Sequence, residues 1–190
     1  MGKTRTSKPT QRRASARSKR AHLLAGGQAG HRSGSHDGNR WLTPSFIVSL
    51  VKASLGGIIH LDPATEPGNP TGALSRFTVA DDGLSKNWTK FTTIFINPPY
   101  STLKPWIDKA IEASHAGCEV ILLLPVRTDA EYHQRLLCEA TDFILIRGRL
   151  KFGRPEAEGE SSAMFGSMLV GLNHSVADLK HLGVLVKVNK

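Results

Sequence analysis

The sequence predicts an α/β fold in which a mostly parallel central sheet carries helices on both faces. Within residues 41–190, segments with helical spacing of apolar residues alternate with short apolar strands, and Gly- and Pro-rich turns separate them. The 190 residues are 39% hydrophobic and 22% charged, which is ordinary for a soluble protein of one domain. A compact single domain over residues 41–190 is therefore expected.

The individual elements follow in order along this domain. Thr43 can cap a first helix that has Pro44 at its first position. A second helix is expected from Leu103 to about Ser114, and a capping box of Thr128 and Glu131 would start a third. Strands are expected at 58–61, 76–80, 93–96, 120–124, 143–146, 150–152 and 164–172, whereas the apolar stretch 183–188 is ambiguous.

The N-terminal segment differs from the rest in charge. The formal net charge is +9, and residues 1–40 alone contain ten Lys or Arg residues and one Asp. This segment lacks apolar periodicity and is rich in Ser and Gly, so we predict a disordered basic arm that suits an anionic partner such as DNA. A passive solubilising tail and an organelle transit peptide are the alternatives.

Cysteine content and hydropathy exclude several other classes of protein. Cys118 and Cys138 form no CxxC motif and no Cys/His pairing, so neither a disulfide framework nor a metal site is predicted. No apolar run approaches the roughly 18 residues that span a bilayer. We therefore expect a protein of the reducing cytoplasm that binds no metal and no membrane.

The most specific motif is Asn97-Pro98-Pro99-Tyr100, which directly follows the strand at 93–96. An amino group conjugated to a ring is a weak nucleophile until acceptors hold its N–H groups near tetrahedral geometry. The Asn97 side-chain oxygen and the Pro98 carbonyl can be those acceptors, and two prolines fix the backbone. Tyr100 can stack on the ring. The alternative is a tight turn with an incidental aromatic residue.

A cofactor that donates a chemical group to that amine is expected to bind at the end of a neighbouring strand. Asp62, Pro63 and Ala64 follow the strand at 58–61, and ligands of such sheets lie beyond the carboxyl ends of the strands. If the strands ending at Asp62 and Asn97 are neighbours, their ends lie about 5 Å apart. Asp82, Gly83 and Leu84 form a third loop in which a carboxylate could accept from an adenine amino group. Taken singly, Asp62 and Asp82 are equally compatible with ordinary turns.

Together, these residues resemble the phage Dam-like DNA adenine-N6 methyltransferases, which are Rossmann-like class I enzymes that use S-adenosylmethionine. The resemblance covers about residues 41–172. It rests on an ordered set of motifs: Trp41-x-Thr43-Pro44, Leu61-Asp62-Pro63-Ala64, Asp82-Gly83-Leu84 with Trp88, Asn97-Pro98-Pro99-Tyr100 with Trp106, Leu123-Leu124-Pro125, and Gly148-Arg149-Leu150-x-Phe152.

The resemblance implies a role for each motif. Thr43 and Pro44 would contact the methionine carboxylate of S-adenosylmethionine, and the loop of Asp62 its amino group or ribose. Asp82 would contact the cofactor adenine. The motif from Asn97 to Tyr100 would hold the target amine of an adenine flipped out of double-stranded DNA. Phe152 would pack against the flipped base and Arg149 would meet a phosphate.

The chain departs from the family pattern in three respects. It has no FxGxG loop after the first strand, no clear ribose-binding acid apart from Glu66, and no separate target-recognition domain. Another planar nitrogen (cytosine N4, an RNA base or a glutamine amide) is an alternative substrate, and a non-catalytic DNA-binding protein is an alternative class. A phage enzyme would act in the host cytoplasm. The sequence leaves the recognition site and oligomeric state open.

Overall fold

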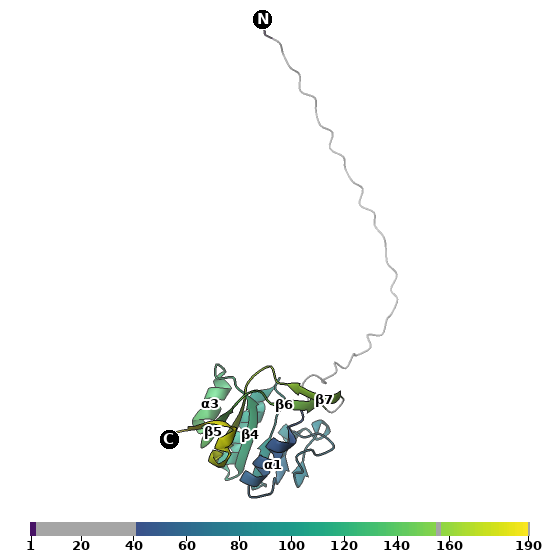
Figure 1. Ribbon diagram of the computed structural model, residues 1–190, viewed down its shortest axis with the longest axis vertical. Coiled ribbons are helices and arrows are strands. Elements are labelled where there is room, and N and C mark those ends of the chain that lie inside the picture. Colours follow the sequence, from purple (N-terminus) through teal and green to yellow (C-terminus); the bar gives the residue numbers. More distant parts are fainter. Residues whose placement is uncertain (3–40, 155–156, 190) are drawn as a thin grey trace, which may run out of the picture. The chain divides into compact units, whose positions relative to one another are not determined.

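A computed structural model describes residues 1–2, 41–154 and 157–189 (Figure 1). The predicted basic arm, apart from Met1 and Gly2, lies outside the described residues. The helices are α1 (Ser45–Ser54), α2 (Leu103–His115) and α3 (Glu131–Glu139), with 3-10 turns η2 (Val79–Asp81), η3 (Gly83–Ser85) and η4 (Ala177–Leu182). The strands are β1 (Leu61–Asp62), β2 (Ser75–Arg76), β3 (Thr93–Ile96), β4 (Glu119–Pro125), β5 (Asp142–Ile146), β6 (Lys151–Arg154), β7 (Ala157–Ser162), β8 (Ser167–Leu172) and β9 (Gly183–Lys187).

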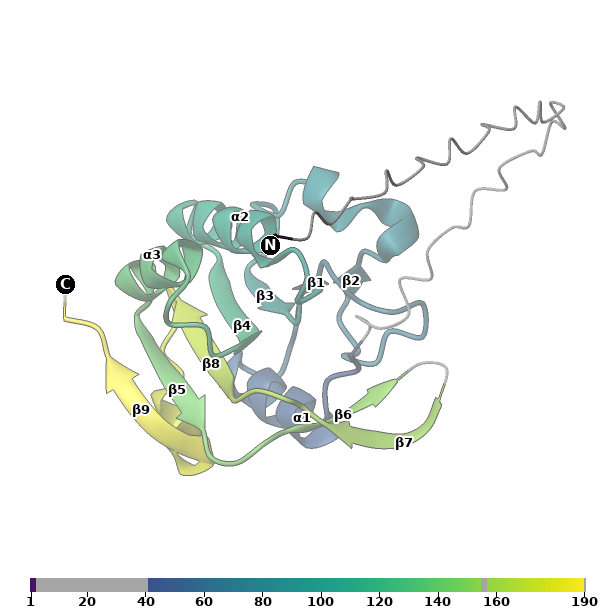
Figure 2. The ribbon, with the colours of Figure 1, turned by 90° about the horizontal axis from the view of Figure 1, so that it is seen from above.

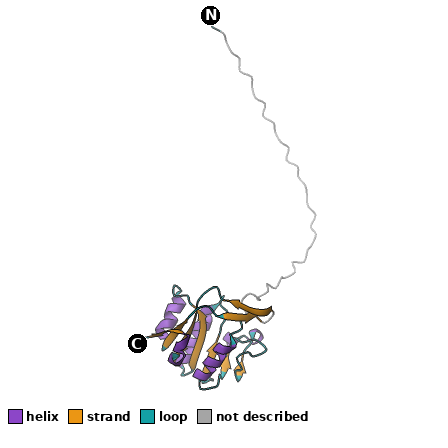
Figure 3. Cartoon of the chain, viewed as in Figure 1, coloured by secondary structure: helices purple, strands orange, loops and turns teal. Residues whose placement is uncertain are grey.

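The domain has a mixed α/β architecture around a seven-stranded sheet (Figure 3). The strand order is β2-β1-β3-β4-β8-β5-β9. The pairs joining β2, β1, β3 and β4 are parallel, whereas β8 pairs antiparallel with both β4 and β5, and β9 pairs antiparallel with β5. The sheet is thus parallel in one half and antiparallel in the other. The expected mostly parallel sheet is therefore confirmed only from β2 to β4; β5 runs in the same direction as these strands, but its neighbours β8 and β9 run opposite to it.

Helices cover both faces of the sheet, as predicted (Figure 2). The side chains of β3 and β4 alternate: Ile94 and Ile96 belong to one core cluster and Phe95 to the other. The first cluster includes residues of α2 and α3, and the second includes residues of α1 and η4. Apart from Thr93 and Glu119 at their first positions, β3 and β4 are therefore apolar and bury side chains on both faces of the sheet.

The residues expected to cap the first and third helices, and the surroundings of the strand expected at 150–152, differ from the structure. Pro44 is the N-cap of α1 without a side-chain cap, so the prediction that Thr43 caps this helix was wrong. The capping box of Thr128 was also wrong, because a turn closed by the bond from Ala130 N–H to the Arg127 carbonyl (3.1 Å) delays α3 until Glu131. The expected strand at 150–152 is β6, which pairs with the unpredicted β7 in a separate two-stranded sheet.

Candidate active site

The candidate site lies where β1 and β3 end side by side. These strands pair in parallel, with Leu61 opposite Ile94, which confirms the prediction that the strands ending near Asp62 and Asn97 are neighbours. Parallel neighbours bring their carboxyl ends to one edge of the sheet, where ligands of α/β proteins bind.

A cavity of about 330 Å³ lies at this edge, within the usual size range of small-molecule sites. The predicted site residues that line it are Thr43, Asp62, Pro63, Ala64, Asp82, Gly83, Leu84, Asn97, Pro98 and Pro99. Four other predicted residues do not line it: Pro44, Tyr100, Arg149 and Phe152. The three separate loops of the sequence prediction thus enclose one cavity.

Asp62 is the buried acid of this cavity, with only 3% of its surface exposed. One carboxylate oxygen accepts from Ala64 N–H at 3.1 Å and the other from the Thr71 hydroxyl at 2.8 Å. Burial raises the pKa of Asp62 to about 6, although these bonds partly oppose the shift. No Lys, Arg or His of the described residues forms an ion pair with it. A ligand that carries positive charge therefore suits this wall.

The loop from Asp82 to Leu84 packs directly on the loop that follows β1. A Cβ atom on Gly83 would lie 2.0 Å from the Pro63 carbonyl oxygen, so only glycine permits this approach. The buried Trp88 indole donates to the Gly83 carbonyl at 2.8 Å and stacks on Trp106, whose ring also lines the cavity. Asp82 adopts the left-handed conformation, with φ of 51°. This loop is held rigidly beside the cavity.

Replacing Gly83 with alanine should therefore separate the two loops. We expect a loss of about 1–3 kcal/mol in stability, the usual cost of overpacking. Gly68→Ala is the matched control, because a Cβ atom on Gly68 would have no other atom within 4 Å and Gly68 does not line the cavity. Thermal denaturation and calorimetry check both variants. Equal stability of the two would contradict the close approach.

Asn97 has its amide group held on one side only. Its Nδ2 donates to the Trp41 carbonyl at 2.9 Å and to the Thr43 hydroxyl oxygen at 3.0 Å. Its Oδ1 is buried and accepts no hydrogen bond from the described residues. An acceptor in this state is costly unless a donor arrives, so Oδ1 suits an incoming N–H group.

The two prolines of the motif keep a second acceptor beside it. The Pro99 carbonyl closes a turn by accepting from Thr102 N–H at 3.2 Å, whereas the Pro98 carbonyl receives no backbone N–H from the described part of the chain. Asn97, Pro98 and Pro99 all line the cavity. Two acceptors, Asn97 Oδ1 and the Pro98 carbonyl, therefore belong to consecutive residues of one cavity wall.

Tyr100 belongs to an aromatic cluster beside the cavity. Its ring meets Phe152 edge-on at 6.3 Å between centroids and Phe165 at 5.4 Å, and Phe152 in turn meets Trp41 at 5.9 Å. Phe152 is 1% exposed, so its free surface is too small to receive a base without movement. Its edge-on contact supports the Tyr100 ring. Sequence reasoning missed Phe165 and assigned Trp41 no role of its own.

The Tyr100 hydroxyl is buried and has no hydrogen-bond partner in the described structure, and burial raises its pKa. Tyr100→Phe is therefore expected to keep near-normal activity and to gain about 1 kcal/mol in stability, since it removes an unpaired polar group. Tyr100→Ala should instead weaken retention of a stacked base by roughly 1–3 kcal/mol. Phe152→Ala should do so to a similar extent, by loss of support. A severe loss of activity in Tyr100→Phe would reveal a role for the hydroxyl.

Arg149 lies at the β6–β7 hairpin and Glu66 lies at the cavity. Arg149 is exposed and donates to the Ala163 carbonyl at 3.0 Å, which ties together the two ends of the β6–β7 hairpin. Glu66 lines the cavity.

The described residues contain no group of three or more His, Cys, Asp or Glu side chains suited to a metal ion. No helix in that part of the chain is long and apolar enough to cross a membrane.

Comparison with known proteins identifies the family. A search of curated proteins gave no match. A family model described as DNA N-6-adenine-methyltransferase (Dam) matches residues 31–190, which include the whole described domain and every residue of the candidate site. The chain belongs to the DNA N-6-adenine-methyltransferase (Dam) family.

Proposed function

We propose that this enzyme transfers a methyl group from S-adenosylmethionine to the N6 amino group of an adenine rotated out of double-stranded DNA. The unpartnered Oδ1 of Asn97 carries this proposal, because it is a buried acceptor placed beside the Pro98 carbonyl on a cavity wall. The family supplies the methyltransferase activity and the DNA substrate. The stacked base must leave the helix, since the motif lies within a cavity.

The cavity residues fit the cofactor. The buried carboxylate of Asp62 has no cationic partner among the described residues, and S-adenosylmethionine carries both an ammonium and a sulfonium group. Asp62 would meet the ammonium group. Asp82 would accept from the cofactor adenine, on the loop that Gly83 and Trp88 hold against Pro63. When bound, the cofactor supplies an electrophilic methyl group on positively charged sulfur.

The residues of the motif would act on the target nitrogen. Asn97 Oδ1 and the Pro98 carbonyl accept its two N–H groups and draw it out of conjugation with the ring, so that its lone pair faces the methyl donor. The nitrogen would take the methyl group that bound S-adenosylmethionine supplies, and the electron pair of the broken C–S bond would remain with the sulfur of the departing cofactor product. The methylated nitrogen then releases one proton to water. No protein base is needed.

The aromatic cluster would hold the flipped base. The partly exposed ring of Tyr100 offers it a surface, and Phe152 and Phe165 keep that ring in place. Arg149 would contact a phosphate of the DNA near the hairpin of β6 and β7. The resemblance to phage enzymes leads us to propose action in the host cytoplasm.

The substrate is tested by offering the protein S-adenosylmethionine with a labelled methyl group together with DNA, RNA or protein. We expect label in DNA, recovered as N6-methyladenine after digestion and mass spectrometry. N4-methylcytosine, or label in RNA or in a glutamine amide, would assign another planar nitrogen. No label would support a non-catalytic protein. A 2-aminopurine at the target position should brighten on binding if the base is flipped.

Asp62 gives a pH-dependent test of cofactor binding. Its pKa of about 6 in the cofactor-free protein means that the ionised form, which attracts a cation, increases as pH rises from about 5 to 7. Cofactor affinity should therefore be about tenfold weaker at pH 5 than above pH 7, because about one molecule in ten is then ionised. Asp62→Asn should abolish this pH dependence.

The raised pKa of Asp62 also predicts the stability of Asp62→Asn. A folded pKa raised above 3.8 makes ionised Asp62 destabilising, and the stability that protonated Asp62 contributes is lost as pH rises through about 6. Asp62→Asn should therefore unfold at the same or a higher temperature than wild type at pH 7. A variant that binds normally at every pH would contradict the contact with the cofactor.

A further inference from the structure

The buried amide of Asn97 is held by a segment more than fifty residues earlier in the chain. Its Nδ2 donates both to the Trp41 carbonyl at 2.9 Å and to the Thr43 hydroxyl oxygen at 3.0 Å. An amide nitrogen has two N–H donors, so these two acceptors use them fully. Oδ1 then faces away from both and stays without a partner in the described structure.

The orientation of the amide follows from the chemistry of these acceptors. The Trp41 carbonyl can only accept, so a rotated amide would set its Oδ1 against another oxygen. The Thr43 hydroxyl can both donate and accept, so it takes the acceptor role once the Trp41 carbonyl has set the orientation of the amide. In that orientation the hydroxyl binds the second N–H, and Oδ1 rather than the NH₂ group is left for a target amine.

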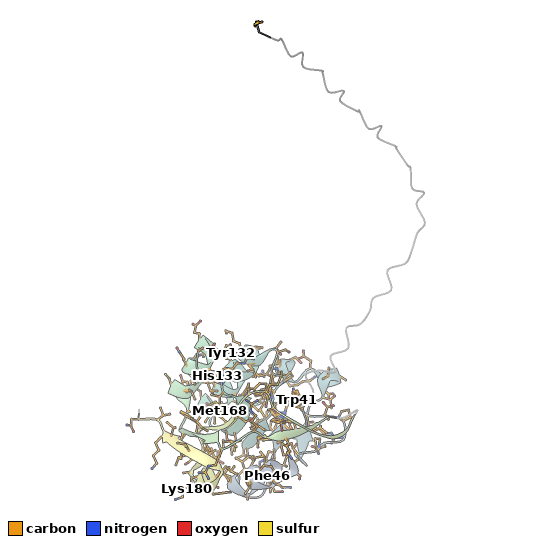
Figure 4. All side chains as sticks on the ribbon, turned by 45° about the horizontal axis from the view of Figure 1, so that its top comes forward. Trp41, Phe46, Tyr132, His133, Met168 and Lys180 are labelled. Atoms are coloured by element: carbon orange, nitrogen blue, oxygen red, sulfur yellow. The ribbon has the colours of Figure 1, made fainter. Side chains whose placement is uncertain are left out.

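The segment Trp41–Thr43 is itself fixed at several points. Leu42 N–H donates to the Gly153 carbonyl of β6 at 3.0 Å, and the Trp41 ring packs edge-on against Phe152 (Trp41 is labelled in Figure 4). Pro44 follows directly and begins α1 as its N-cap, accepting from Val48 N–H at 3.1 Å. The acceptors therefore stand on a rigid support.

We propose that Thr43 is a positioning residue that holds the Asn97 amide with its oxygen toward the target amine. This role goes beyond the contact with the cofactor that its motif suggested, and the two differ in what they predict. A positioning residue affects the rate of methyl transfer, whereas a cofactor contact affects cofactor affinity. The proposal rests on the proposed function for its kinetic test, but its structural test is independent.

Thr43→Val keeps the shape of the side chain and removes the acceptor. At saturating cofactor and DNA, we expect kcat to fall about 3- to 10-fold, the scale of one lost hydrogen bond, because the Trp41 carbonyl still holds the other N–H. The cofactor Kd should stay within about twofold of wild type. Thr43→Ser restores the acceptor and should recover most of the kcat. Thr141→Val, an exposed threonine that does not line the cavity, is the matched control.

NMR of the side-chain amide provides a readout that needs no activity. The Asn97 NH₂ signals are assigned by their absence in Asn97→Ala, and in Thr43→Val one of the two protons should shift and exchange faster with solvent. Thr43→Ala serves the same purpose if the valine variant does not fold. Unchanged amide signals, an unchanged kcat, or a loss confined to the cofactor Kd would overturn the proposal. A wild-type protein that methylates no DNA would instead refute the proposed function, while the amide signals still decide the role of Thr43.

Discussion

Asn97→Ala is expected to lower methyl transfer about a hundredfold or more while leaving cofactor binding nearly intact. The side chain supplies one of the two acceptors for the target amine, and removing one preorganised polar contact from a transition state has an effect of this size. Single-turnover rates with saturating DNA measure the loss, and calorimetry measures the cofactor Kd. The variant should also lose some stability, because the Trp41 carbonyl loses its bond from Nδ2.

Two controls separate this effect from a general one. Asn87→Ala, at an exposed site that does not line the cavity, should leave the rate unchanged. Asp82→Ala should show the reciprocal behaviour, with weaker cofactor binding. Activity of Asn97→Ala within threefold of wild type would refute the role of Asn97, and unchanged cofactor affinity in Asp82→Ala would refute that of the third loop.

Removal of the basic segment is expected to have the largest effect on DNA affinity. Residues 1–40 contain ten of the 25 Lys and Arg residues, and the formal net charge of residues 41–190 is zero. If about five of these ten contact phosphates, the slope of log affinity against log salt should fall by roughly 4–5 on deletion. Between 50 and 200 mM salt, the full chain should then lose about 500-fold more affinity than the truncated one.

The family match suggests where to truncate. Because the matched range begins at residue 31, deletion of residues 1–30 removes eight of the ten basic residues and leaves that range whole. A full-length variant with the same eight residues changed to glutamine tests charge without changing chain length. Turnover at low salt and saturating DNA should match wild type in both. Unchanged affinity and salt slope would show a passive tail, and lost turnover at saturation would place the segment in the active site.

The sequence by itself determined the elements whose signals are local. The strand expected at 93–96 is β3, residue for residue, and α2 begins at Leu103 as its apolar spacing predicted, because burial of one face imposes a period on a helix. The three loops of the site were also found from local signals, because each contains turn residues that follow an apolar or turn-forming segment. The motif at Asn97 was recognised from its residue types and its place after a strand, and the family match confirms the resemblance to which the motifs together led.

The tertiary structure alone decided which distant groups meet and how each is held. A buried apolar strand reads the same in either direction, so nothing local placed β8 antiparallel between β4 and β5. The raised pKa of Asp62 and the need for glycine at Gly83 depend on neighbours brought in by packing. The orientation of the Asn97 amide depends on acceptors at Trp41 and Thr43, which only the folded chain brings within hydrogen-bond distance. Hydrogen bonds and desolvation act over a few ångströms in space, whereas the patterns read from a sequence extend only along the chain.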